Sequence, residues 1–248
     1  MTDNIHYIFG LMPDFGGKPW SYIHYLSVKS SLIINPNHKI HFWYEFEPVG
    51  EWWTKTKPYI TLHKINSSDN IFGNPLLHYA HKTDILRIQV LKEYGGIYID
   101  SDVICLKPFN EINHCGFWMA KQYDYGLCNA TMGGDKDAKF LDIWLDSYKT
   151  FRSKGWDPYW DEHSVKIPKQ LSKRFPEHIT ILDQNKCFVP FCYNIQDIFH
   201  ENKSKYLSES YSVHLWETIS WNFISQITPD NLNKNSELGS ILQKNGII

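Results

Sequence analysis

Short runs of apolar residues alternate with longer amphipathic stretches along the first half of the chain. Five of the short runs have the length and composition of β-strands. They are residues 5–9, 39–44, 59–63, 97–100 and 103–106. Helices are expected over 20–34 and 83–94. Because strands that alternate with helices form mostly parallel sheets covered on both faces, the pattern predicts an α/β fold with three layers.

The helix expected over 83–94 has well-defined ends. Thr83 is expected to be its N-cap, because a threonine hydroxyl can accept a hydrogen bond from a backbone N–H of the first turn. Gly95-Gly96 provides the left-handed backbone that commonly ends a helix. The next strand leads directly into Asp100-Ser101-Asp102. Ligands of parallel sheets bind at the carboxyl ends of strands, so we expect both aspartates at a binding edge.

The pattern is looser in the second half of the chain. Short strands are expected over 117–120 and 129–132, and a helix is expected to begin after Asp137 as its N-cap. A further helix is expected between residues 160 and 175.

No internal repeat or low-complexity linker divides the chain. We expect one domain over 1–227 and a C-terminal tail over 228–248, which is rich in Asn, Ser and Lys. No run of about eighteen apolar residues is present, so no membrane span is expected. The N-terminus lacks the basic and apolar regions of a signal peptide.

Charge and cysteine content narrow the functional classes. The formal net charge is −2, without the basic excess that nucleic-acid binding requires, so we expect no nucleic-acid partner. The five cysteines form no CxxC pair or zinc-like spacing. They are Cys105, Cys115, Cys128, Cys187 and Cys192. An odd number without a secretory signal indicates reduced thiols and a cytoplasmic protein.

Aromatic residues make up 16% of the chain, which is more than core packing usually needs. Aromatic rings stack on the apolar faces of sugars and on nucleobases, so this excess favours a carbohydrate-handling protein. Trp52-Trp53 and the pair Trp156 and Trp160 could line an acceptor groove. For these clusters, as for most of the individual aromatic residues, a place in the core is the preferred interpretation.

The Asp100-Ser101-Asp102 triplet can bind a divalent cation, because two carboxylates one residue apart can reach the same ion. Mn²⁺ or Mg²⁺ held there would neutralise the diphosphate that leaves from a nucleotide sugar. Two surface aspartates at the end of a strand are the simpler alternative.

Side chains upstream of the triplet strengthen the first interpretation. Asp84 and Arg87 are three residues apart and share one face of the expected helix. Arg87 could bind phosphate and Asp84 could bind sugar hydroxyls, although a simple ion pair within the helix is the alternative. Tyr98 shares a strand face with Asp100, because side chains alternate along a strand.

Residues 81–87, 94–102 and 106–108 together resemble the sugar-binding DXD region of family 32 glycosyltransferases. The family includes yeast initiating mannosyltransferases, bacterial capsule-assembly enzymes and, more distantly, clostridial glucosylating toxins. The resemblance implies a GT-A-like, Rossmann-related three-layer sandwich. It also implies a retaining enzyme of polysaccharide biosynthesis that moves a hexose from a UDP- or GDP-sugar to a glycan, lipid-linked or protein acceptor. A lipid-linked acceptor would require peripheral contact with the inner face of the membrane.

The resemblance also implies roles for particular residues. It implies that Asp100 and Asp102 bind the metal and that Asp100 and Ser101 contact the donor. It also implies that Asp84, Arg87 and Tyr98 surround the donor sugar. In the first strand, where the family commonly has a tryptophan, it implies that Phe9 lies near the base. Further along the chain, it implies that Asn129 lies near the donor sugar, that His214 completes the metal site, and that Trp221 covers the pyrophosphate. Without the resemblance, His214 between Val213 and Leu215 is better explained as a partly buried structural histidine.

Two other functions remain open at the level of sequence. One is a phosphatase or phosphotransferase with an Asp-x-Asp nucleophile, which would place the acidic pair after the first strand. The other is a non-catalytic protein that binds a carbohydrate or a nucleotide sugar.

Overall fold

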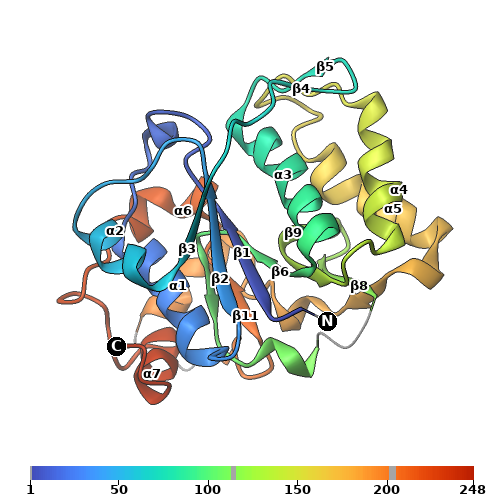
Figure 1. Ribbon diagram of the computed structural model, residues 1–248. Helices are drawn as coiled ribbons and strands as arrows, with labels where there is room; N and C mark the ends of the chain where they lie inside the picture. The colour runs from blue at the N-terminus through green and yellow to red at the C-terminus, as the bar shows by residue number, and fades with distance from the viewer. Residues whose placement is uncertain (1, 113–115, 201–204) are drawn as a thin grey trace.

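A computed structural model describes residues 2–112, 116–200 and 205–248 (Figure 1). Its centre is a seven-stranded sheet in the order β10-β8-β9-β6-β1-β2-β3. The strands are β1 (Asn4–Ile8), β2 (Lys39–Tyr44), β3 (Thr61–Lys64), β6 (Gly96–Ile99), β8 (Phe117–Gln122), β9 (Gly126–Gly134) and β10 (Thr180–Leu182). Neighbouring strands are parallel except where β9 pairs with β6 and β8, which confirms the expected mostly parallel sheet. Cys115 lies outside the described residues.

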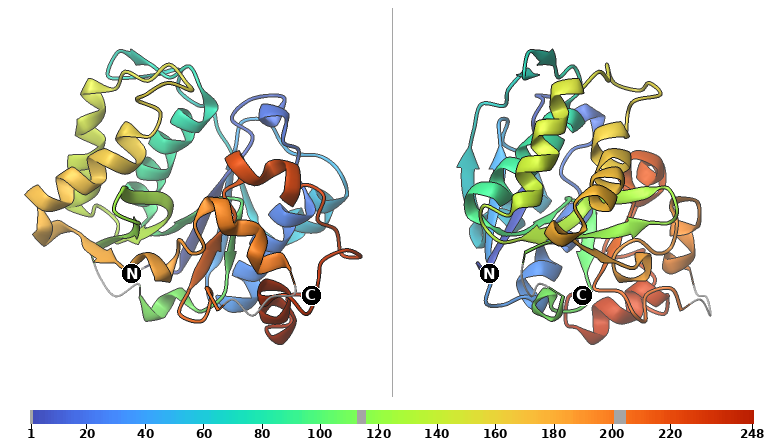
Figure 2. Two further views of the ribbon diagram at one scale, coloured as in Figure 1. Left: turned by 180° about the vertical axis from the view of Figure 1, so that it is seen from behind. Right: turned by 90° about the vertical axis from the view of Figure 1, so that its right-hand side faces the viewer.

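Helices cover both faces of this sheet, which confirms the three layers (Figure 1, Figure 2). One face is covered by α3 (Tyr79–Tyr94), α4 (Lys139–Ser147) and α5 (Ile167–Arg174). The other is covered by α1 (Tyr22–Ile34), α2 (Glu51–Thr56), α6 (Glu217–Ile224) and α7 (Glu237–Lys244). Short helical turns connect these elements. They are η1 (Phe15–Gly17), η2 (Lys57–Tyr59), η3 (Phe109–Glu111), η4 (Tyr148–Thr150), η5 (Glu162–Lys166), η6 (Pro176–His178), η7 (Gln184–Lys186) and η8 (Cys192–Phe199).

The strand that precedes the acidic triplet separates two hydrophobic cores. Ile97 and Ile99 of β6 point into the core under α1, whereas Tyr98 points into the core under α3. Alternation along the strand therefore places Tyr98 on the face that α3 covers. Asp100 follows directly after the last residue of β6.

The helix before this strand begins earlier than the sequence suggested. The imidazole of His78 caps α3 by accepting the Ala80 N–H at 3.1 Å. Thr83 is therefore not the N-cap. It lies inside the helix, where its hydroxyl donates to the carbonyl of Tyr79. The expected C-terminal stop is confirmed, because Gly95 has a φ of 63° and its N–H donates to the Leu91 carbonyl.

The expected capping by Asp137 is also wrong. The N-cap of α4 is Ala138, and Asp137 has a left-handed backbone with a φ of 60°. Its N–H donates to the carbonyl of Lys92 at the end of α3, so this residue joins two helices instead of starting one.

A second, smaller sheet brings the C-terminal part of the chain to the acidic triplet. β7 (Val103–Cys105) pairs antiparallel with β11 (Ser212–His214), and His214 lies opposite Val103. A separate short hairpin is formed by β4 (Asn70–Ile71) and β5 (Asn74–Pro75).

The segment 228–248, expected as a tail, contributes to the core under α1. Its buried apolar residues are Leu232, Leu238, Leu242 and Ile247. Among the described residues, no helix is both long enough and apolar enough to cross a membrane.

Candidate active site

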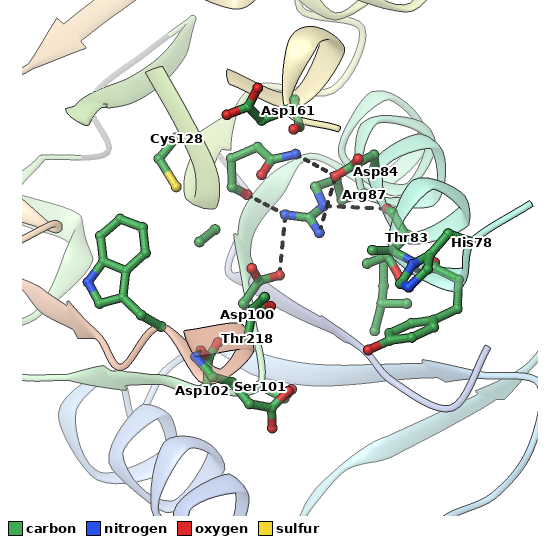
Figure 3. Close-up of a pocket in the computed structure, with 18 of the residues that line it drawn as sticks. His78, Thr83, Asp84, Arg87, Asp100, Ser101, Asp102, Cys128, Asp161 and Thr218 are labelled. Carbon is green, nitrogen blue, oxygen red and sulfur yellow. Dashed lines mark hydrogen bonds and ion pairs between the residues drawn. The ribbon is translucent and has the colours of Figure 1, made fainter. Parts of the chain in front are cut away.

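A cavity of about 410 Å³ lies at the carboxyl ends of β1 and β6. Its walls come from the loop after β1, from α3 and β9, and from the residues around β11 and the start of α6. Figure 3 shows Asp84 and Arg87 on α3, Asp100 near the centre, and Asp102 and Ser101 below. Sequence positions separated by more than a hundred residues thus meet in one cavity.

The guanidinium of Arg87 is buried at the centre of a polar network. Its Nη1 donates to the Asn129 carbonyl at 2.9 Å and lies 3.3 Å from a carboxylate oxygen of Asp100. Nη2 lies 3.5 Å from Asp84, and the group stacks 4.5 Å above the centre of the Tyr98 ring. Burial acts to lower the pKa of Arg87, but Asp100 raises it above its ordinary value, so the guanidinium remains charged.

Asp84 and Asn129 form the part of the cavity wall next to Arg87. The side-chain amide of Asn129 donates to Asp84 at 2.8 Å, and both residues line the cavity. The second carboxylate oxygen of Asp84 lies 3.5 Å from His81. The structure therefore brings Asp84, Arg87 and Asn129 together at the cavity.

Asp100 is held between Arg87 and Tyr98. The Tyr98 hydroxyl donates to the Asp100 carboxylate at 2.5 Å. Burial raises the pKa of Asp100, while the positive charge of Arg87 acts in the opposite direction. Arg87 of α3 and Tyr98 of β6 thus fix the orientation of the Asp100 carboxylate.

Asp102 is held by the C-terminal part of the chain. His214 Nε2 lies 3.2 Å from its carboxylate, and the backbone N–H of Glu217 donates to the same oxygen at 2.7 Å. Burial would raise the pKa of Asp102, but His214 and this N–H bring it to about 2. Against the effect of burial, the contact with Asp102 raises the pKa of His214 well above its ordinary value.

Asp100, Asp102 and His214 can provide ligands to one cation. One ligand atom from each residue lies within 4.8 Å of the others, and all three residues line the cavity. Carboxylate oxygens suit Mg²⁺ and Mn²⁺, and an imidazole nitrogen is compatible with a transition metal such as Mn²⁺. The donor set therefore fits a divalent cation.

Of the remaining predicted site residues, some line the cavity and one does not. Phe9 and Ser101 line the cavity, and Phe9 stacks on Phe15 with ring centres 5.6 Å apart. Trp221 is not part of the cavity wall; it stacks on His24 at 6.0 Å and packs against the core under α1. The tryptophan that does line the cavity from this segment is Trp216.

Sequence reasoning missed several residues of the cavity. His78, Asp161 and Glu217 line it. Trp156 and Trp160 also line it; the sequence offered them as possible residues of an acceptor groove, but a place in the core was the preferred interpretation. Trp156 is 69% exposed. The two tryptophans are close in sequence, but no local pattern distinguishes a tryptophan pair in a core from one at an open cavity.

Two proteins of known name are similar to this chain in sequence. The first, "Glucan organizing enzyme 1" of Cryptococcus neoformans, is 32% identical over 95% of this chain and 68% of its own length. The second, "Inositol phosphoceramide mannosyltransferase 3" of Schizosaccharomyces pombe, is 26% identical over 46% of this chain, and the match spans 29% of that protein.

Comparison with solved structures supports the fold. The glycosyltransferase GlyE of Streptococcus pneumoniae superposes with a TM-score of 0.50 at 12% identity, covering 100% of this chain and 61% of that one. The sheet and its helices are those of a GT-A-like glycosyltransferase, as expected. Residues 24–118 match the family described as a glycosyltransferase sugar-binding region containing a DXD motif. The chain therefore belongs to this family of glycosyltransferases, and Asp100-Ser101-Asp102 is its DXD motif.

Proposed function

We propose that the protein transfers a hexose from a UDP- or GDP-sugar to a hydroxyl group of a glycan, lipid-linked or protein acceptor, with retention of configuration. The observation that carries this proposal is the convergence of Asp100, Asp102 and His214 at the cavity that Arg87 and Asp84 also line. The name of the second relative, an inositol phosphoceramide mannosyltransferase, supports mannose as one donor sugar to test.

The metal residues are proposed to be Asp100, Asp102 and His214, with Mn²⁺ or Mg²⁺ as the ion. The ion would supply positive charge against the diphosphate as it leaves. Asp102 remains ionised at neutral pH, since its pKa is about 2, and so is ready to act as a ligand. The backbone N–H of Glu217 holds its carboxylate in place.

Asp84, Asn129 and Arg87 are proposed to bind the donor sugar. The Asp84 carboxylate can accept hydrogen bonds from sugar hydroxyls beyond the one it accepts from Asn129. Arg87 is already bonded to protein groups, so its main role is to orient Asp84 and Asp100 and to supply positive charge near the phosphates.

The other proposed roles concern the base of the donor, the attack of the acceptor and two further residues of the site. Phe9 lies at the end of β1 and offers an aromatic ring for the base. We assign retention to attack of the acceptor hydroxyl on the same face of the sugar from which the diphosphate departs, with the leaving phosphate accepting the hydroxyl proton. The Tyr98 hydroxyl donates a hydrogen bond to the Asp100 carboxylate and so holds it in place. Ser101, in the turn of the DXD motif, contacts the donor.

Hydrolysis and transfer assays across UDP- and GDP-sugars, each with Mn²⁺ or Mg²⁺, test this function directly. Substitution Asp102→Asn removes the ligand charge and should lower metal-dependent turnover by about a hundredfold or more. Asp230→Asn is the matched control, because it replaces a carboxylate by an amide at an exposed position outside the cavity. Turnover that is equal in Asp102→Asn and the wild type would contradict the metal site.

A further inference from the structure

A second, open groove adjoins the cavity on the side away from the metal residues. It has a volume of about 520 Å³ and shares Trp156, Trp160 and Asp161 with the first cavity. Tyr125 and Lys166 also line it. In Figure 3, Asp161 lies beyond Arg87 and Asp84 as seen from Asp102 and Ser101. The groove therefore begins where a donor sugar bound at Asp84 would end.

Two stacked indoles form the apolar surface of this groove. The rings of Trp156 and Trp160 are nearly parallel, at 12°, with centres 4.2 Å apart. Trp160 packs in turn against His78 and His81, each at 4.8 Å. Trp156 lies on this support and remains 69% exposed, so it offers a large, fixed apolar surface to solvent.

The loop that carries Trp156 is held in one conformation by its own polar contacts. The carboxylate of Asp157 accepts hydrogen bonds from the backbone N–H groups of Lys154 and Tyr159 and from the Ser153 hydroxyl. Ser153 also bonds to His81 on α3 at 3.0 Å. These contacts hold the backbone of the loop in place before any ligand arrives, which lowers the entropic cost of binding.

The polar side of the groove has balanced charges. Asp161 accepts a hydrogen bond from the Tyr125 hydroxyl at 2.5 Å and pairs with Lys166 at 2.8 Å. The carboxylate of Asp157 is occupied by its loop contacts. A charged ligand would find no unpaired partner of opposite sign among these groups, whereas hydroxyl groups could bond to all of them.

We propose that this groove is the acceptor subsite, and that it binds a neutral pyranose of the acceptor by stacking on Trp156. Sugars have an apolar C–H face and a polar rim, which match the indole on one side and the Asp161, Tyr125 and Lys166 cluster on the other. This inference rests on the proposed function for its catalytic meaning, but sugar binding in the groove can be measured without turnover.

The test uses methyl α- and β-glycosides of glucose, galactose and mannose as probes. Their binding to the full chain, with UDP or GDP and Mg²⁺ present, is followed by saturation-transfer NMR and tryptophan fluorescence. Trp156→Ala should weaken binding of the best glycoside at least about tenfold, equivalent to about 1.4 kcal/mol. Trp156→Phe, which keeps an aromatic face, should recover most of that loss. Tyr193→Ala is the matched control, because Tyr193 is an 80% exposed aromatic residue outside both cavities.

Three results would overturn the proposal. They are the absence of glycoside binding to the wild type, equal binding by Trp156→Ala, and a loss of UDP or GDP affinity in Trp156→Ala as large as the loss of glycoside affinity. The last result would mean that Trp156 stacks on the donor base. Donor hydrolysis by the wild type is measured separately, so failure of the proposed function is distinguishable from failure of the acceptor subsite.

Discussion

At the scale of single residues, Arg87 decides how the acidic side chains of the site are arranged. It is buried between Asp84 and Asp100, and its N–H groups are directed at protein acceptors. A buried charge of this kind is costly unless it is paired. The pairing here fixes two carboxylates at the cavity wall, so Arg87 links the electrostatics of the site to the stability of the fold.

Tyr98 tests whether the orientation of Asp100 matters for metal binding. Tyr98→Phe removes the hydroxyl that donates to Asp100 at 2.5 Å. Loss of a partner that orients a ligand should weaken Mn²⁺ binding by about tenfold or more, as measured by isothermal titration calorimetry.

Tyr148→Phe is the control for the Tyr98 substitution. Both hydroxyls are buried, but that of Tyr148 has no hydrogen-bond partner among the described residues. Its removal should leave Mn²⁺ affinity unchanged. Equal affinities in the two variants would show that the Tyr98 hydroxyl does not position the metal ligand.

At the scale of elements, β6 depends on the two glycines that separate it from α3. Gly95 ends the helix with a left-handed backbone, and Gly96 begins the strand with a φ of 103°. A Cβ atom on Gly96 would lie 2.4 Å from the carbonyl oxygen of Asn4 on the neighbouring β1. The close approach of the two strands therefore requires glycine at this position.

Gly96→Ala should consequently destabilise the protein by about 2–5 kcal/mol, because it combines an unfavourable backbone with overpacking. Urea denaturation measures the free energy of unfolding. Gly246→Ala is the matched control, since Gly246 also has a positive φ but an added Cβ would meet no atom within 4 Å. The prediction fails if both substitutions cost the same.

At the scale of the whole molecule, a histidine cluster at the sheet links stability to pH. His6 on β1 is buried, accepts a hydrogen bond from the Trp43 indole and donates one to the Gly95 carbonyl. Burial lowers the pKa of His6 to about 4, despite the opposing effect of the Gly95 carbonyl. Burial also lowers the pKa values of His41 and His63 on β2 and β3.

These shifts predict that the free energy of unfolding decreases as the pH falls below about 6.5 toward 4. In that range the unfolded chain binds more protons than the folded one, so acid favours unfolding. For His6 alone the loss is on the order of 3 kcal/mol. His6→Gln keeps an acceptor for Trp43 and a donor for Gly95 but does not titrate. Urea denaturation at a series of pH values should therefore show a smaller decrease in this variant, and an unchanged decrease would contradict the assignment.

Much of the sheet and the DXD motif could be predicted from local sequence. Apolar runs identified β1, β2 and β6, and Gly95-Gly96 marked the end of α3, because strand alternation and glycine conformation act over a few residues. The caps of α3 and α4 were less predictable. Several residues near a helix start can accept the same backbone N–H, and in α3 the fold selected the imidazole of His78. α4 begins after Ala138, which has no side chain that could accept such a bond.

Only the tertiary structure decided which distant residues complete the site. β11 pairs with β7, so His214 comes beside Asp102, while the same arrangement packs Trp221 away from the cavity. It also leaves Trp156 exposed on Trp160. The sequence by itself determined the acidic motif, the strand before it and the Asp84–Arg87 spacing, because these depend on residues close along the chain. The opposite wall depends on long-range pairing and on burial, which no local pattern specifies.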